Sequence, residues 1–168
     1  MTTTAATTNR QIQLASLPTG KLGPEHFQLV QAPLPQPADG DVLLKVRLIS
    51  LDAANRAWMQ GATYRAALGA GQVMAGGSIS EVVESRAPGF APGDLVFADT
   101  GWQEYAALPA KALTRQQQPA PGSPLSHLLS VYGIAGLTAY FGLLQVGKPK
   151  AGETVVVSAA AGSVGSLV

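Results

Sequence analysis

The sequence has 168 residues, of which 46% are hydrophobic and 12% charged. This balance excludes a disordered chain and supplies a core for one domain, or for one domain and part of another. The net charge of +1 excludes the basic surface that nucleic acids and anionic membranes attract, and the lack of cysteine excludes disulfides and thiolate zinc sites.

Two segments are candidates for a signal peptide or a membrane span, and neither has the required pattern. Residues 1–8 are polar, without the basic and apolar regions of a signal peptide, and indicate a frayed tail. Residues 128–146 are uncharged and close to membrane-spanning length, but glycine, serine, threonine and glutamine interrupt them. A buried helix explains this stretch better, so we expect a soluble, cytoplasmic protein with no membrane or nucleic-acid partner.

Residues 11–113 alternate short β-like runs with turn signals. The expected strands are 12–14, 27–30, 42–49, 80–85, 95–98 and one that begins at Trp102. In residues 42–49, Lys45 and Arg47 alternate with apolar neighbours, which is typical of a half-buried strand. Short strands at this spacing predict a compact antiparallel barrel.

The composition changes after Pro124. Residues 126–146 are small and apolar and predict one or two helices. Residues 154–158 form an unbroken β-branched run, which is typical of a central parallel strand buried on both faces. A helix is expected to begin near Gly162.

A strand followed by a small-residue turn and a helix is the first unit of a dinucleotide-binding fold. Glycine there lets the backbone approach a pyrophosphate, and the first helical amides bind its charge. The turn Ala160-Ala161-Gly162-Ser163-Val164-Gly165 lacks the full three-glycine fingerprint. Cofactor binding and simple tight packing both account for it.

A series of motifs runs through the chain. It begins at Asn9-Arg10-Gln11 and includes residues 33–37, 50–52, 83–85, 88–90, 93–96, 101–105, 136–142, 147–149 and 152–160. Together these motifs resemble the zinc-independent alkenal/one oxidoreductases of the medium-chain dehydrogenase/reductase superfamily, a family that includes prostaglandin, leukotriene and curcumin reductases. The lack of cysteine agrees with the zinc-free branch.

The resemblance implies an NADPH enzyme with two domains and the active site between them. Residues 1–125 would form a mainly β, chaperonin-10-like (GroES-like) catalytic domain. Residues 126–168 would form linking helices and the truncated start of an α/β Rossmann domain. The implied reaction is hydride transfer to the β-carbon of an enone or enal, with hydrogen-bond donors stabilising the enolate. The full-length enzyme would be a homodimer with a small-molecule substrate.

The resemblance also implies site residues. Thr138 would lie at the nicotinamide, and the pyrophosphate would be lined by Ala161, Gly162, Ser163, Val164 and Gly165. Many family members carry a tyrosine where this chain has Ala54, so Asn55 or Tyr64 would supply the missing hydrogen-bond donor to the substrate. No metal site is expected, because His26 and His127 have no partners at ligand spacing.

Other interpretations stay open at this point. A quinone reductase shares the barrel, the cofactor turn and the lack of zinc, and a binding or assembly module would need no catalysis. Asp52 and Arg56, four residues apart, predict an exposed ion pair, and Tyr140 is expected in the core. We also expect the chain to be part of a longer protein, since residues 154–158 lack neighbouring strands to pair with.

Overall fold

The computed structural model describes residues 8–168. It divides into two compact units, one that ends at Gln117 and one that runs from Gln118 to Val168. This division falls shortly before the expected boundary between residues 1–125 and 126–168. The assignment of catalytic and cofactor-binding roles to those two ranges stays a prediction.

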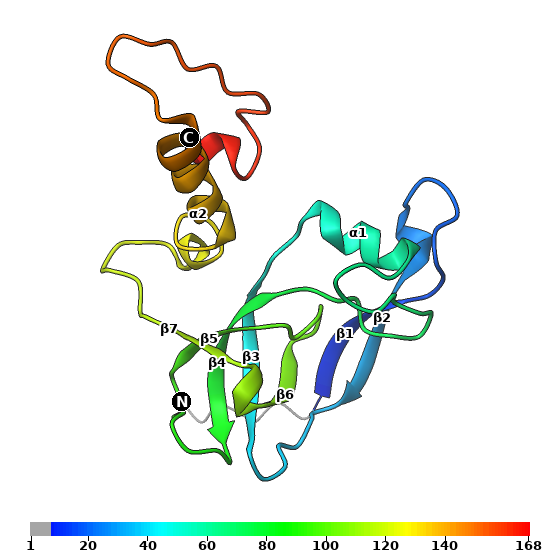
Figure 1. Ribbon diagram of the computed structural model, residues 1–168. Coiled ribbons are helices and arrows are strands. Elements are labelled where there is room, and N and C mark those ends of the chain that lie inside the picture. The colour runs from blue at the N-terminus through cyan, green and yellow to red at the C-terminus, as the bar shows by residue number, and fades with distance from the viewer. Residues whose placement is uncertain (1–7) are drawn as a thin grey trace. The chain divides into compact units, whose positions relative to one another are not determined.

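The first unit is built from antiparallel strands (Figure 1). Its strands are β1 (Thr8–Leu14), β2 (Phe27–Pro33), β3 (Asp41–Ile49), β4 (Ser78–Ser85), β5 (Leu95–Ala98), β6 (Tyr105–Pro109) and β7 (Thr114–Gln116). β1 and β2 form a two-stranded sheet, and the other five pair in the order β6-β3-β4-β5-β7. Isolated bridges from Gln11 to Gln103 and from Gln13 to Val73 tie β1 to the rest of the unit. The mainly β, GroES-like class is confirmed.

The core of the five-stranded sheet follows from the alternation of side chains along its strands. Lys45 and Arg47 of β3 are exposed, while Leu44 between β4 and β6 is fully buried. The main cluster consists of Val42, Leu44, Val82, Val96 and Ala98. β3 and β4 shift register between Leu43 and Leu44, where Val83 is the extra, unpaired residue of β4.

One helix, α1 (Ala53–Gln60), follows β3, and the short 3₁₀ turns η1 (Pro24–His26) and η2 (Ala110–Ala112) complete the unit. The buried face of α1 includes Trp58 and Met59. Met59 packs with Leu14 and Met74 in a second apolar cluster. This cluster fixes the position of α1, and with it the residues around Asn55.

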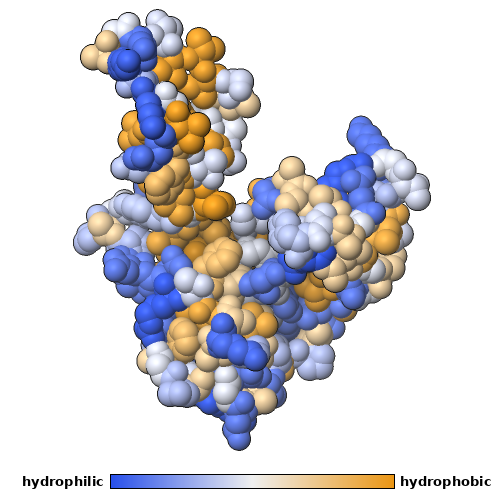
Figure 2. All heavy atoms as spheres, viewed as in Figure 1, coloured by the Kyte–Doolittle hydropathy of each residue, from blue (hydrophilic) through white to orange (hydrophobic). Residues whose placement is uncertain are grey.

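The second unit is helical and short. It contains η3 (Leu125–Leu128), α2 (Ile134–Tyr140), the π-helical turn η4 (Phe141–Gly147) and η5 (Gly165–Leu167). The helices expected over residues 126–146 are therefore present. Tyr140 is more than half exposed, so its expected place in a core is wrong. Figure 2 shows apolar side chains exposed on this unit in the face that is in view.

The strand expected at residues 154–158 is not formed. All of residues 118–168 are described, and they contain no strand. A parallel strand is stabilised only by neighbours, and none is present for this run to pair with. Val156 is consequently 89% exposed. The helix expected from Gly162 is limited to the three residues of η5, and no helix among the described residues is long and apolar enough to span a bilayer.

Candidate functional site

A cavity of about 590 Å³ in the second unit collects most of the predicted cofactor-binding residues. Thr138 of α2 lines it together with Gly162, Ser163, Val164 and Gly165. Ala161, which was predicted with them, is exposed and does not line it. The cavity is also lined by residues 155–159, which overlap the strand expected at 154–158, and by Gly142 and Leu143, which are not among the predicted cofactor-binding residues.

The two glycines of the turn, Gly162 and Gly165, differ in how much space the structure leaves for a side chain. The Gly162 amide donates to the Ala159 carbonyl at 2.8 Å, and Ala159 itself adopts a left-handed φ of 50°. A Cβ on Gly165 would collide with the Ala159 carbonyl oxygen, whereas a Cβ on Gly162 would lie 3.1 Å from that oxygen. Tight packing therefore accounts for Gly165, but it constrains Gly162 much less.

Thr138 is exposed, and its hydroxyl donates to the Ile134 carbonyl at 2.6 Å, one helical turn earlier. This is a common arrangement for threonine within a helix, and it fixes the side-chain rotamer. The hydroxyl oxygen keeps acceptor capacity, and the methyl group supplies an apolar contact. Thr138 can therefore offer a hydrogen-bond acceptor and an apolar contact to a ligand in the cavity.

Asn55 is held at the start of α1 by structural hydrogen bonds. Its side-chain oxygen accepts from the Asp52 amide at 2.7 Å, and its amide nitrogen donates to the Ala75 carbonyl at 2.9 Å. The side chain is buried. These bonds join α1 to the residues that precede β4. Because the Asn55 side chain is buried and already bonded, Tyr64 is the better candidate of the two predicted donors to a substrate.

Asp52 caps α1 and does not pair with Arg56 as expected. Its carboxylate accepts from the Ala54 amide at 2.8 Å, while the Arg56 guanidinium donates to the Gly20 carbonyl at 2.7 Å. The reason is local: the N-cap position directs the Asp52 side chain to the free amides of the first turn. The expected pair is therefore wrong.

Loss of this cap gives a first prediction. Asp52→Ala should lower the free energy of unfolding by about 1 kcal/mol, because a helix amide loses its acceptor. Asp52→Asn should retain most of the stability, since asparagine also caps helices. Urea unfolding measures both, with the exposed Asp39→Ala as a control expected within about 0.5 kcal/mol of the parent. An unchanged midpoint for Asp52→Ala would contradict the capping role.

Tyr64 lies in the loop between α1 and β4 and is 82% exposed. Its ring makes an edge contact with the buried Trp58 of α1, at 6.0 Å between centroids and 88° between planes. The structure thus places Tyr64 and Asn55 on the same segment of the first unit, one exposed and one buried. Only Tyr64 presents its side chain to solvent.

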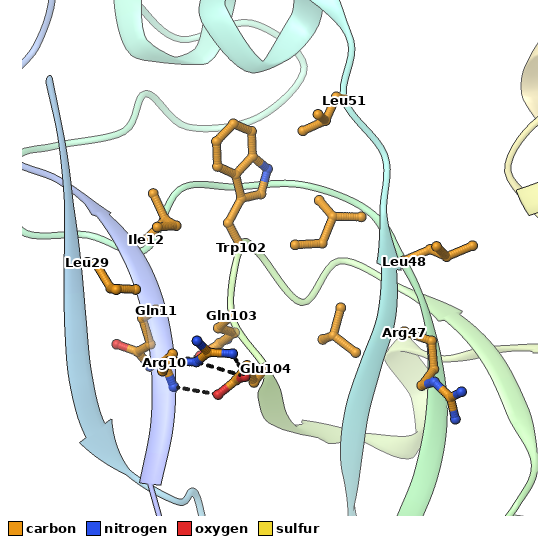
Figure 3. Close-up of a pocket in the computed structure, with 12 residues that line it drawn as sticks. Arg10, Gln11, Ile12, Leu29, Arg47, Leu48, Leu51, Trp102, Gln103 and Glu104 are labelled. Carbon is orange, nitrogen blue, oxygen red and sulfur yellow. Dashed lines mark hydrogen bonds and ion pairs between the residues drawn. The ribbon is translucent and has the colours of Figure 1, made fainter. Parts of the chain in front are cut away.

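A second cavity, of about 540 Å³, lies in the first unit and was not predicted from the sequence (Figure 3). Its walls come from β1, β2, β3 and residues 102–104, and its apolar lining comprises Ile12, Leu29, Val46, Leu48, Ile49, Leu51 and Trp102. Trp102 and Leu51 lie at one end and the Arg10–Glu104 pair at the other. Its lining residues come from segments far apart in the chain, so no local motif could reveal it.

The polar end of this cavity is an ion pair. Arg10 and Glu104 are joined at 2.6 Å, and the hydrogen bond from the Arg10 side chain holds the pKa of the Glu104 carboxyl below its ordinary value. The same bond raises the pKa of Arg10. Both groups therefore stay charged and neutralise one another, so this end presents no net charge to a ligand.

The Trp102 ring stacks on Phe27 at 5.7 Å, which confirms its expected packing against the barrel. Its indole nitrogen is buried beside Gly76, where a Cβ would lie 2.8 Å from it. Gly76 therefore makes room for the indole. Asp94 has the expected turn role, because its carboxylate accepts from the Ala91 amide, and this bond lowers the pKa of Asp94.

Within residues 8–168, no group of three or more histidine, cysteine, aspartate or glutamate side chains could hold a metal ion.

The residues that form the antiparallel strands and α1 of the first unit match a known family of oxidoreductase domains. A family described as the N-terminal domain of oxidoreductase matches residues 10–115, more than half of the chain. The chain belongs to this family, in the zinc-independent alkenal/one oxidoreductase branch of the medium-chain dehydrogenases/reductases.

Several known proteins are similar to the chain. The NADPH-dependent curcumin reductase of Escherichia coli is 42% identical over 161 residues, which cover 95% of this chain and 46% of that protein. Prostaglandin reductase 1 of Bos taurus is 39% identical over 143 residues, covering 84% of the chain and 42% of that protein. The crystal structure of CurA from Vibrio vulnificus in complex with NADPH has a TM-score of 0.82 at 42% identity, covering 94% of this chain and 47% of that one. The chain thus spans about half the length of the relatives that it matches.

Proposed function

We propose that the full-length protein containing this sequence reduces the C=C bond of α,β-unsaturated ketones and aldehydes with NADPH. The observation that carries the proposal is the 42% identity to a relative named as an NADPH-dependent curcumin reductase, over nearly the whole chain. Prostaglandin reductase 1, at 39% identity, supports the same class of activity.

The residues of the second unit fit NADPH in kind. The side chains that line the cavity with Thr138, Gly162, Ser163, Val164 and Gly165 are uncharged, and those of the turn are mostly small. Such walls let backbone amides approach a pyrophosphate closely. We assign the nicotinamide end to Thr138 and the pyrophosphate to the turn that includes Ala161–Gly165. Residues 1–125 and 126–168 are then the catalytic domain and the start of the Rossmann domain.

NADPH would supply a hydride to the β-carbon of the substrate. The C=C electron pair moves toward the carbonyl, so negative charge develops on the carbonyl oxygen, and a proton then adds to the α-carbon. A hydrogen-bond donor directed at that oxygen stabilises the enolate. We assign this donor to the exposed hydroxyl of Tyr64. Asn55, the second predicted donor, orients the start of α1. One of its two side-chain amide protons is bonded to Ala75, and the other could donate to the enolate oxygen.

Steady-state kinetics of the full-length protein with an alkenone and with a quinone test this proposal. We expect NADPH-dependent turnover of the alkenone with a higher kcat/KM than for the quinone. Faster turnover of the quinone would favour the quinone reductase alternative. NADPH binding with no turnover of either compound would favour a binding or assembly module. The cytoplasmic location and the homodimer stay predictions.

A further inference from the structure

The loop that carries Tyr64 needs an anchor if its hydroxyl is to meet a substrate in a fixed position. Tyr64 is largely exposed, and its ring contact with Trp58 is a single edge. A cavity of about 380 Å³ is lined by Arg65, Leu68, Gln72 and Val73 of this loop and by residues 99–101. Leu68 packs against the apolar cluster of Leu14, Met59 and Met74, whereas no such packing holds the exposed Tyr64 itself.

Arg65, the next residue, makes the contacts that Tyr64 lacks. Its guanidinium lies over the Trp58 ring, 4.5 Å from the centroid. The same group forms an ion pair with Asp99 at 2.7 Å. The Arg65 side chain is 29% exposed, less than the 51% of Asp99, so it is partly enclosed between its two partners. One side chain thus links the loop to α1 and to the segment after β5.

Both partners are fixed. Trp58 is 5% exposed, and its carbonyl accepts from the Leu68 amide at 2.9 Å. Asp99 is followed by the buried Thr100, whose hydroxyl donates to Ser78 at 2.7 Å and whose carbonyl accepts from the Gln103 side chain at 2.6 Å. Arg65 is therefore held between α1 and the segment that follows β5.

We infer that Arg65, clamped between Trp58 and Asp99, is a positioning residue for Tyr64, acting on the orientation of its hydroxyl toward the substrate carbonyl. The inference rests on the proposed function for its kinetic consequence, but its structural part does not. A planar guanidinium suits this place because it stacks on an indole and bonds a carboxylate at the same time.

Amide hydrogen exchange of the 168-residue chain tests the structural part. Arg65→Gln and Asp99→Ala should each speed exchange of the Thr63 and Leu68 amides by about threefold to tenfold, because the loop opens more often. Exchange of core amides such as that of Val82 should not change. The control is Arg86→Gln, which removes an exposed ion pair with Glu84 and should leave the loop unaffected. Unchanged exchange at Thr63 and Leu68 would overturn the clamp.

Kinetics of the full-length protein test the link to Tyr64. Arg65→Gln should lower kcat for an alkenone by about tenfold while leaving the Kd of NADPH unchanged. Asp99→Ala should also lower kcat, and Asp99→Glu, which keeps a carboxylate for Arg65, should restore most of the lost rate. In a Tyr64→Phe background, Arg65→Gln should cause little further loss, because the two residues act through one hydroxyl.

These outcomes separate the two proposals. If Arg65→Gln lowered kcat as much in the Tyr64→Phe background as in the parent, the positioning role would be overturned. An unchanged kcat in Arg65→Gln alone would overturn it as well. Absence of alkenone turnover in the unsubstituted protein would instead overturn the proposed function, while the exchange measurements would still decide whether the clamp exists.

Discussion

Gly162→Val should weaken NADPH binding by the full-length protein at least about tenfold, which corresponds to about 1.4 kcal/mol. A branched side chain would project from an exposed turn that lines the cavity we assign to the pyrophosphate. A Cβ at this position would lie 3.1 Å from the Ala159 carbonyl oxygen and 4.0 Å from the Ala159 Cβ, so a small shift of the turn accommodates it. Fluorescence titration with NADPH gives the Kd directly.

Gly165 is a poorer probe of the cofactor, because any side chain there collides with the backbone at Ala159 and Ala160. The matched control is Gly20→Val, since a Cβ on Gly20 has no atom within 4 Å. We expect this control to bind NADPH like the parent. A Gly162→Val protein with the parent's Kd would show that the glycine serves packing alone.

Leu44→Ala should lower the free energy of unfolding of the first unit by about 2–5 kcal/mol. Leu44 is completely buried, and it pairs across β3 with Val82 on one side and Ala106 on the other. The antiparallel sheet fixes the surrounding backbone, which limits how far the structure can close over the lost side chain. Urea unfolding followed by circular dichroism measures the change.

Leu51→Ala is the control for this substitution. Leu51 is 71% exposed, so removal of its side chain should change the free energy of unfolding by no more than about 0.5 kcal/mol. A loss below 1 kcal/mol for Leu44→Ala would show that the cluster of Val42, Val82, Val96 and Ala98 does not depend on it.

Most strands of the first unit could be predicted because their signals are local, but the short β7 (Thr114–Gln116) was not predicted. Alternation in β3, the glycine and proline turns around β5 and the turn before β3 each act within a few residues. The run at 154–158 has an equally clear local signal, yet it forms no strand here. Its β propensity can be satisfied only by neighbouring strands, which no local pattern supplies.

The candidate site was predictable only in part for the same reason. The small-residue turn is contiguous, so Gly162 and its neighbours could be identified from their order. The Arg65 clamp could not, because Trp58, Arg65 and Asp99 come from three separate segments. Asp52 shows a further limit, since spacing predicts a pair with Arg56 but the free amides of α1 compete for the carboxylate.

Reduction of an alkenone by the full-length protein with NADPH deuterated at the transferred position tests the central claim most directly. NMR of the product locates the label. The account predicts deuterium on the β-carbon, an intact carbonyl and a proton from solvent on the α-carbon. Deuterium on the carbonyl carbon, with the C=C bond retained, would contradict it.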